Sequence, residues 1–161
     1  MKTLFRALLM LSLAIPTAPI RLAAQDADPV AVLDARQRAF EARNLDAAMA
    51  WFADDAVVTV LVGTPRQARY VGRDAIQRWQ ETLLNERSVR VESAGDRRVE
   101  GDTVTWTARV SRAEWQAMGL ESLELWGEAV VRDGKISSLR NGLTPASAEK
   151  LGAAVARQKG Q

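Results

Sequence analysis

The feature that most constrains the fold is the dipeptide Asp133-Gly134, which separates two runs of strand-forming residues at 124–132 and 135–141. Asp-Gly is a favoured sequence for the two-residue turn of a β-hairpin, because both turn residues must adopt positive φ angles. A turn of this length also sets the pairing of the strands that it joins. The sequence therefore predicts an antiparallel hairpin over residues 124–141.

The register of this hairpin determines which side chains share a face. With a two-residue loop, Glu128 is opposite Leu139, and Trp126 is opposite Asn141. Both pairs lie on the same side, because side chains alternate along a strand. We therefore expect Trp126, Glu128 and Asn141 on one wall of the sheet.

The rest of the chain indicates helices before the sheet and one helix after it. Apolar residues recur at helical spacing in three N-terminal stretches, for which Asp28 and Asn44 are suitable caps. The strand expected at 103–111 alternates, with Trp106 on its apolar face. We expect helices from Pro29, from Leu45 to Phe52, after Gly72, within 112–120 and from Thr144-Pro145, and strands at 56–62, 88–100 and 103–111.

This order of elements is typical of an α+β fold with a meandering antiparallel sheet. The bulkiest helical residues would cover the concave side of that sheet; they are Met49, Phe52, Trp79 and Leu83. Residues 25–161 have the length of a single domain with one core, and residues 143–161 form its C-terminal tail or short helix.

Residues 1–24 have the three-part layout of a secretory signal peptide. Lys2 and Arg6 give a positive start, residues 7–15 are apolar, and small residues end at Ala24. The apolar run is shorter than the about 20 residues that a membrane-spanning helix needs. We expect cleavage after Ala24 and a secreted or periplasmic protein without stable membrane insertion. A membrane anchor or a frayed helix is the alternative.

Cleavage would change the charge of the chain. The full sequence has 22 Lys and Arg residues against 20 Asp and Glu residues, whereas residues 25–161 have 19 against 20. This balance provides no basic face for a polyanion, so we expect no nucleic-acid partner.

The chain contains neither His nor Cys. His is the commonest general base and metal ligand, while Cys provides disulfides and thiol nucleophiles. Nucleophiles of the Ser-His and Cys-His types are therefore excluded, and no group of the remaining residues has the spacing of a metal site. We expect no metal and no other cofactor.

Three segments of the sequence are similar to those of the nuclear transport factor 2-like superfamily, in its SnoaL-like branch of small bacterial domains. They are residues 44–58, Gly72 to Ile76 and Arg132 to Ile136. The resemblance implies a cone-shaped, curved sheet around a pocket, with the three N-terminal helices on its concave face. Isomerases, cyclases, hydrolases and proteins without catalysis share this cone-shaped fold, so the resemblance implies no particular reaction.

The resemblance also implies that Leu139 and Asn141 point into the cone. Glu128 would then lie beside the indole of Trp126, where desolvation raises a carboxylate pKa and suits a general acid or base. Glu128 is the candidate catalytic residue; the alternative is a Glu128 that is solvated or paired with an Arg. The candidate ligand-binding residues are Trp126, Asn141, Trp106, Leu139 and Phe52.

The catalytic residues of the family's known enzymes are mostly absent. The catalytic Asp of ketosteroid isomerases corresponds to Val60 here, and their oxyanion Tyr falls at or near Arg36. The two aspartates of limonene-epoxide hydrolases are lost at 109–111 and 139–141. The polyketide cyclases use a His, which this chain lacks.

Three functions remain open. The first is an exported domain with a pocket for a small, largely apolar ligand. The second is an enzyme of the isomerase, lyase or hydrolase type that uses Glu128 as general acid or base. The third is a non-catalytic interaction module, whose convex sheet face forms the homodimer that we expect. The first two differ in whether Glu128 faces a cavity, and the third is favoured if Trp106, Trp126 and Phe52 close it.

Overall fold

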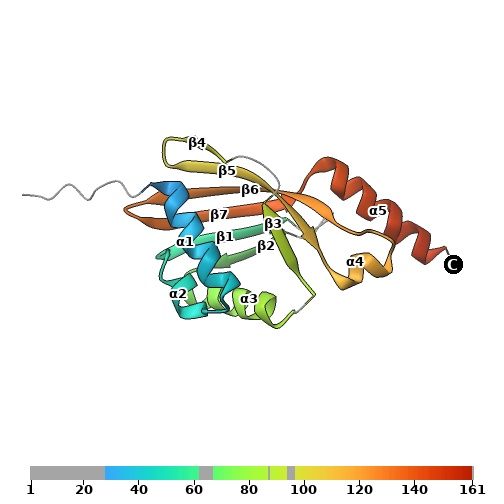
Figure 1. The fold of residues 1–161 in the computed structure, drawn as a ribbon, viewed down its shortest axis with the longest axis horizontal. Helices are drawn as coiled ribbons and strands as arrows, with labels where there is room; N and C mark the ends of the chain where they lie inside the picture. Colours follow the sequence, from blue (N-terminus) through green and yellow to red (C-terminus); the bar gives the residue numbers. More distant parts are fainter. Residues whose placement is uncertain (1–27, 62–66, 87, 94–96, 161) are drawn as a thin grey trace, which may run out of the picture.

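The computed structural model describes residues 28–61, 67–86, 88–93 and 97–160, and within them helices and strands follow in an α+β order (Figure 1). The helices are α1 (Pro29–Glu41), α2 (Leu45–Met49), α3 (Arg73–Asn85), α4 (Ala113–Ala117) and α5 (Pro145–Lys159). The strands are β1 (Phe52–Leu61), β2 (Gln67–Val71), β3 (Arg90–Ser93), β4 (Arg98–Glu100), β5 (Thr103–Ser111), β6 (Leu123–Arg132) and β7 (Lys135–Leu143).

Side-chain caps begin α1, α2 and α5 where the sequence predicts these helices to start. Asp28 accepts a hydrogen bond from the backbone N–H of Val30 at 3.0 Å, and Asn44 accepts one from that of Ala47 at 3.0 Å. Thr144 caps α5 in the same way. Each cap satisfies a donor that the first helical turn leaves unpaired.

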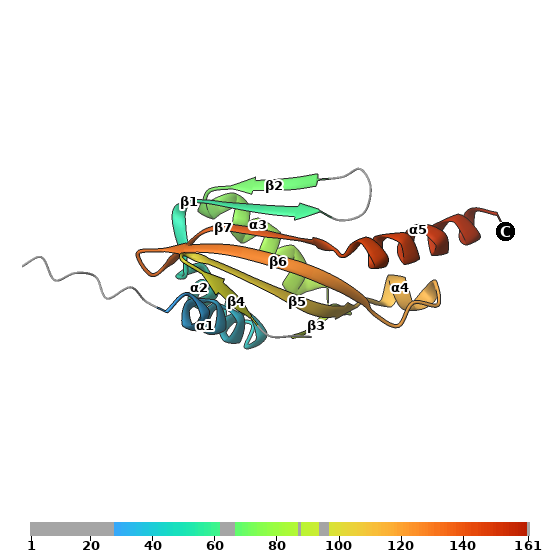
Figure 2. The ribbon, with the colours of Figure 1, turned by 90° about the horizontal axis from the view of Figure 1, so that it is seen from above.

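The strands form one sheet in the order β2-β1-β7-β6-β5-β3, and β4 pairs with β5. The pairing of β1 with β7 is parallel, whereas the other pairings are antiparallel. The sheet is therefore mixed, not purely antiparallel as expected. It is strongly curved and does not close into a barrel (Figure 2).

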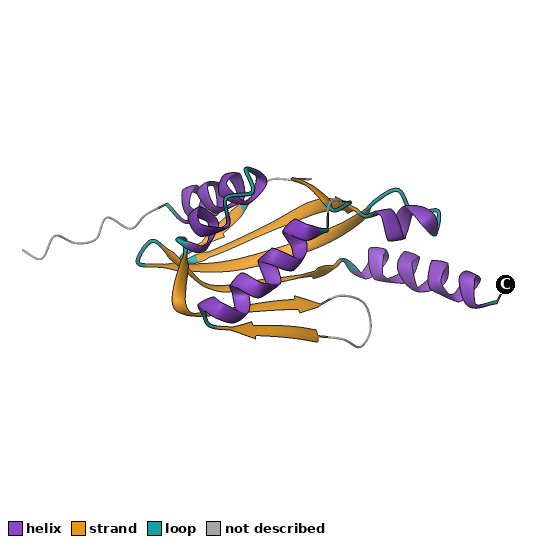
Figure 3. Cartoon of the chain, turned by 90° about the horizontal axis from the view of Figure 1, so that it is seen from below, coloured by secondary structure: helices purple, strands orange, loops and turns teal. Residues whose placement is uncertain are grey.

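The helices α1, α2 and α3 lie over one face of the sheet, while α4 and α5 lie at the far end of the molecule (Figure 3). The main core fills the space between the first three helices and the sheet, and a second cluster of Val110, Trp115 and Leu123 lies at the α4 end. The expected α+β cone with three N-terminal helices on its concave face is confirmed. Among the described residues, no helix has both the length and the apolar character to cross a membrane.

The strand β1 begins earlier than predicted. Phe52, which we expected on the second helix, is its first residue, and α2 ends at Met49. Phe52 pairs with Ile136 of β7 and is 1% exposed. This pairing and burial override the helical spacing of the apolar residues, because local propensity is weaker than tertiary packing.

The predicted hairpin turn is present. Asp133 and Gly134 have φ angles of 51° and 70°, and Val131 pairs with Ile136 across the turn. Positive φ at both central residues is typical of the type I′ turn that matches the twist of a hairpin.

Beyond this pair, the predicted register is wrong by one residue. Val130 pairs with Ser138, so Ser137 is an extra residue in β7. A β-bulge of this kind moves all later residues of the strand to the opposite face relative to the expected pairing. Glu128 therefore pairs with Arg140 and not with Leu139.

Candidate functional site

A cavity of about 210 Å³ lies between α1, α3 and the concave face of the sheet, and α4 contributes to one end of it. Its walls are mostly aromatic and aliphatic. The helices contribute Arg36, Gln37, Phe40, Trp79, Leu83 and Trp115. Side chains of the sheet include Val60, Trp106, Ala108, Leu125, Leu139 and Asn141.

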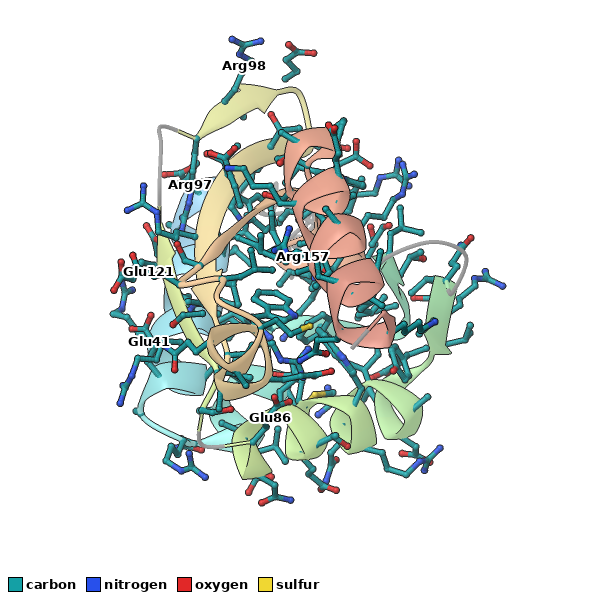
Figure 4. All side chains as sticks on the ribbon, turned by 90° about the vertical axis from the view of Figure 1, so that its right-hand side faces the viewer. Glu41, Glu86, Arg97, Arg98, Glu121 and Arg157 are labelled. Carbon is teal, nitrogen blue, oxygen red and sulfur yellow. The ribbon has the colours of Figure 1, made fainter. Side chains whose placement is uncertain are left out.

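A second cavity of about 110 Å³ adjoins the first. Arg36, Gln37 and Trp106 are among the residues that border both. The second cavity extends to the flank of the molecule on which Glu41 and Arg97 lie (Figure 4). Arg36 therefore stands at the junction of the two cavities.

The guanidinium of Arg36 is held in place by two glutamines. Its Nη1 donates to Gln37 Oε1 at 3.2 Å, and its Nη2 donates to Gln80 Oε1 at 3.1 Å. Gln80 is fully buried, and its Nε2 lies 3.1 Å from the sulfur of Met49, which fixes the orientation of its amide. The position of Arg36 thus depends on contacts from both α2 and α3.

The charge of Arg36 has no carboxylate partner within 4.0 Å in the described part of the chain. Its Nε–H is buried and lacks an acceptor there. The Cζ atom lies 4.9 Å from the ring centre of Phe40 and 5.8 Å from that of Phe52. Burial lowers the pKa of the Arg36 guanidinium from its ordinary value to about 10, so the group remains charged at neutral pH.

The α4 end of the cavity carries a guanidinium whose charge is neutralised. Arg112 Nε donates to Glu86 Oε1 at 2.9 Å, and its Nη2 donates to Glu86 Oε2 at 2.6 Å. Glu86 follows the last turn of α3, below α4 in the view along the molecule (Figure 4). This bidentate pair joins α3 to the start of α4.

Four of the predicted ligand-binding residues border the larger cavity. They are Trp106, Leu139, Asn141 and Trp126. The ring of Trp126 is 5.8 Å from the Arg140 guanidinium, which lies on the face opposite to Asn141. Phe52 does not border this cavity but is buried in the main core. A ligand-binding role for the four stays a prediction.

Glu128 lines neither cavity. The bulge places it opposite Arg140, whose Nη1 donates to Glu128 Oε1 at 3.1 Å. Asn141 follows Arg140 along β7 and points to the other face. The predicted common wall of Glu128 and Asn141 is therefore wrong, and Glu128 forms the ion pair that was its alternative interpretation.

Sequence reasoning missed Arg36 as a residue of the cavity. The signal was present: Leu33, Arg36 and Phe40 lie at positions i, i+3 and i+7 of α1, which places a charged residue on the apolar face. Trp79, predicted only as a core residue, also borders the cavity and stacks on Tyr70 with ring centres 5.5 Å apart.

The described wall of the larger cavity has a limited chemistry. None of its described residues carries a carboxylate, a hydroxyl or an amine. In the same described ranges, no three acidic residues cluster closely enough to hold a metal ion. The wall can therefore bind an apolar body and donate hydrogen bonds from Arg36, Gln37 or Asn141, whereas it offers no side chain suited to move a proton near neutral pH.

Solved structures with this fold include nuclear transport factor 2-like proteins. A candidate polyketide cyclase from Sinorhizobium meliloti is 26% identical, with a TM-score of 0.58 over 69% of this chain and 93% of that chain. A nuclear transport factor 2-like protein of unknown function from Mesorhizobium loti is 20% identical, with a TM-score of 0.61 over 72% and 90%. A candidate ketosteroid isomerase from Kribbella flavida is 14% identical, with a TM-score of 0.58 over 72% and 77%.

No curated protein matches the sequence. The family model of the SnoaL-like domain, however, matches residues 33–139, which is more than half of the chain. This range runs from α1 to β7 and includes Arg36 and Trp106 of the cavity wall. The resemblance inferred from residues 44–58 is confirmed, and the chain belongs to the SnoaL-like domain family of the nuclear transport factor 2-like superfamily.

Proposed function

We propose that the mature chain is an exported protein that binds a small, largely apolar molecule in the cavity between α1, α3 and the sheet. The observation that carries this proposal is the composition of the wall, which is aromatic and aliphatic with a few polar groups, as in most ligand pockets. The cavity of about 210 Å³ is smaller than the roughly 300 Å³ at which typical ligand pockets begin. A compact ligand, such as a two-ring aromatic molecule, suits this space.

The same wall favours binding over catalysis. The enzyme hypothesis depended on Glu128, which forms an ion pair with Arg140 on the opposite face. No described residue of the wall replaces it as a general acid or base. The cavity is also open rather than filled by Trp106 and Trp126, which argues against a purely structural module. The homodimer stays a prediction.

A titration with naphthalene-2-carboxamide tests this function. Because Trp79, Trp106 and Trp115 border the cavity, binding should change the tryptophan fluorescence of the protein. Ala108→Leu adds bulk to a side chain that borders both cavities, so it should weaken binding. The matched control is Thr105→Leu, three residues earlier on the opposite, exposed face of β5.

The wild type and Thr105→Leu should bind the carboxamide equally well. Absence of binding to the wild type, both of this carboxamide and of the corresponding carboxylate, contradicts the proposed function. Equal binding by Ala108→Leu and Thr105→Leu, with both variants folded, would place the ligand outside the cavity and contradict it as well.

A further inference from the structure

Arg36 differs from the other arginines that border the two cavities. Arg112 pairs with Glu86 at 2.6 Å, and Arg97 pairs with Asp34 at 2.5 Å. The Arg36 guanidinium has five N–H donors, of which one contacts Gln37 and another contacts Gln80. Its Nε–H is buried and has no acceptor among the described residues. The contacts with Gln37 and Gln80 use only one N–H of each terminal nitrogen, so donors remain there for a bound molecule.

An unpaired charge at this position is costly. Arg36 is partly buried, so its cation loses part of its hydration, which a counterion or hydrogen bonds can replace. The rings of Phe40 and Phe52 offset part of this loss through cation–π contacts. A molecule that brought one negative charge to Arg36 would supply the missing counterion and gain from the low polarity of the wall.

We propose that Arg36 binds the carboxylate of the ligand, so that the pocket takes a small apolar monocarboxylic acid. This inference rests on the proposed function and names the chemical class of the ligand. One positive charge without a carboxylate partner among the described residues suits a monoanion. The planar fork of a guanidinium matches the two oxygens of a carboxylate. The apolar body of the acid then lies in the larger cavity, against Trp79 and Trp106.

The junction of the two cavities supports this orientation. Arg36 borders both of them, and the larger one is lined by aromatic and aliphatic side chains from α3 and β5. A bound acid would therefore have its charged end at α1 and its apolar end toward α4. Arg112, the other charged residue of the described wall of the larger cavity, is paired with Glu86 at that far end and so does not compete for the carboxylate.

The experiment compares naphthalene-2-carboxylate with its neutral counterpart naphthalene-2-carboxamide by calorimetric titration of the purified full chain. The wild type should bind the carboxylate about tenfold to a hundredfold more tightly, which is the range expected for one charge-assisted hydrogen bond. In Arg36→Met, this preference should fall to about one, while the affinity for the carboxamide changes little. The control is Arg38→Met, an exposed arginine of the same helix, which should keep the wild-type preference.

The outcomes separate this inference from the function on which it rests. If the wild type binds the carboxamide at least as tightly as the carboxylate, or if Arg36→Met keeps the preference for the carboxylate, the inference is overturned and the pocket still binds apolar molecules. If neither compound binds the wild type, the proposed function fails and the inference fails with it. Should Arg36→Met not fold, Arg36→Gln is the second neutral variant, and a preference that survives in it also overturns the inference.

Discussion

The indole of Trp106 on β5 lies directly over Gly127 on β6. The two residues are paired across the sheet, and a Cβ atom added at Gly127 would stand 2.3 Å from Cε2 of the ring. The space that glycine leaves therefore allows the indole to lie against the sheet. In this position Trp106 forms part of the wall of both cavities.

Gly127→Ala should force the indole of Trp106 away from the sheet. The expected loss is about 1–3 kcal/mol in the free energy of unfolding, the usual cost of overpacking a core. Denaturant unfolding measures it, with Gly152→Ala on α5 as the control, because nothing lies within 4 Å of a Cβ added there. The free energy of unfolding of the control should increase by about 0.5–1 kcal/mol, since alanine is a better helix former than glycine. Equal stability changes in the two variants would contradict the close contact of Trp106 with Gly127.

Arg36→Met should be at least as stable as the wild type at neutral pH, because it removes a desolvated charge that has no carboxylate partner among the described residues. Burial lowers the pKa of Arg36 to about 10 in the folded protein. The folded state therefore binds fewer protons than the unfolded state between about pH 10 and the ordinary pKa of arginine. The free energy of unfolding of the wild type increases as the pH rises through this range. The advantage of the variant should be full at about pH 9 and smaller at about pH 11.

Urea unfolding of both proteins at these two pH values measures the difference. Arg38→Met, on the exposed part of α1, is the control and should change the free energy of unfolding by less than about 0.5 kcal/mol. A variant that is less stable than the wild type at neutral pH, by an amount independent of pH, would show that the two glutamine contacts of Arg36 outweigh its desolvation.

Trp79→Ala should lower the free energy of unfolding by about 3 kcal/mol, at the low end of the range for a deleted aromatic core residue, because Trp79 is only partly buried. Trp79→Phe should lower the free energy of unfolding by a smaller amount, since a phenyl ring can still stack on Tyr70. Guanidinium unfolding of the two variants measures both losses. An unchanged midpoint in Trp79→Ala would mean that the tryptophan contributes no packing to the fold.

Glu128→Gln should leave ligand binding unchanged, because Glu128 faces Arg140 on the side of the sheet opposite to Asn141. The side chains of Glu128 and Arg140 are 33% and 49% exposed. Loss of this ion pair should therefore lower the free energy of unfolding by less than about 1 kcal/mol. Titration with naphthalene-2-carboxamide and thermal unfolding measure the two effects. A large loss of binding in a folded variant would show that Glu128 belongs to the binding site.

The protein from its native host should begin near Gln25. Residues 1–24 combine a positive start, an apolar run and a small-residue end, which is the layout of a cleaved secretory signal. Intact mass of the purified protein decides the point. A soluble species that retains Met1 would contradict export.

Much of the fold could be predicted locally. Asp28 and Asn44 cap helices by short-range hydrogen bonds, and Asp133-Gly134 supplies the positive φ angles of a hairpin turn, so a few neighbouring residues encode each feature. Alternation along 103–111 likewise placed Trp106 on the buried face, because the period of a strand is set by its own backbone. These local signals, together with the family resemblance, were sufficient for the α+β cone.

The composition of the site was decided by contacts between distant segments. The bulge at Ser137 separates Glu128 from Asn141, and no local pattern distinguishes Ser137 from Ser138 as the extra residue. Its position is selected when β7 pairs with β6 and β1 at once, which buries Leu139 and exposes Arg140. The sequence alone thus determined the elements, their order and the family, through short-range turn, cap and periodicity effects. The tertiary structure alone decided which face each strand residue occupies. It also placed Arg36 at the cavity without a carboxylate partner among the described residues, because register and charge pairing depend on residues far apart in the chain.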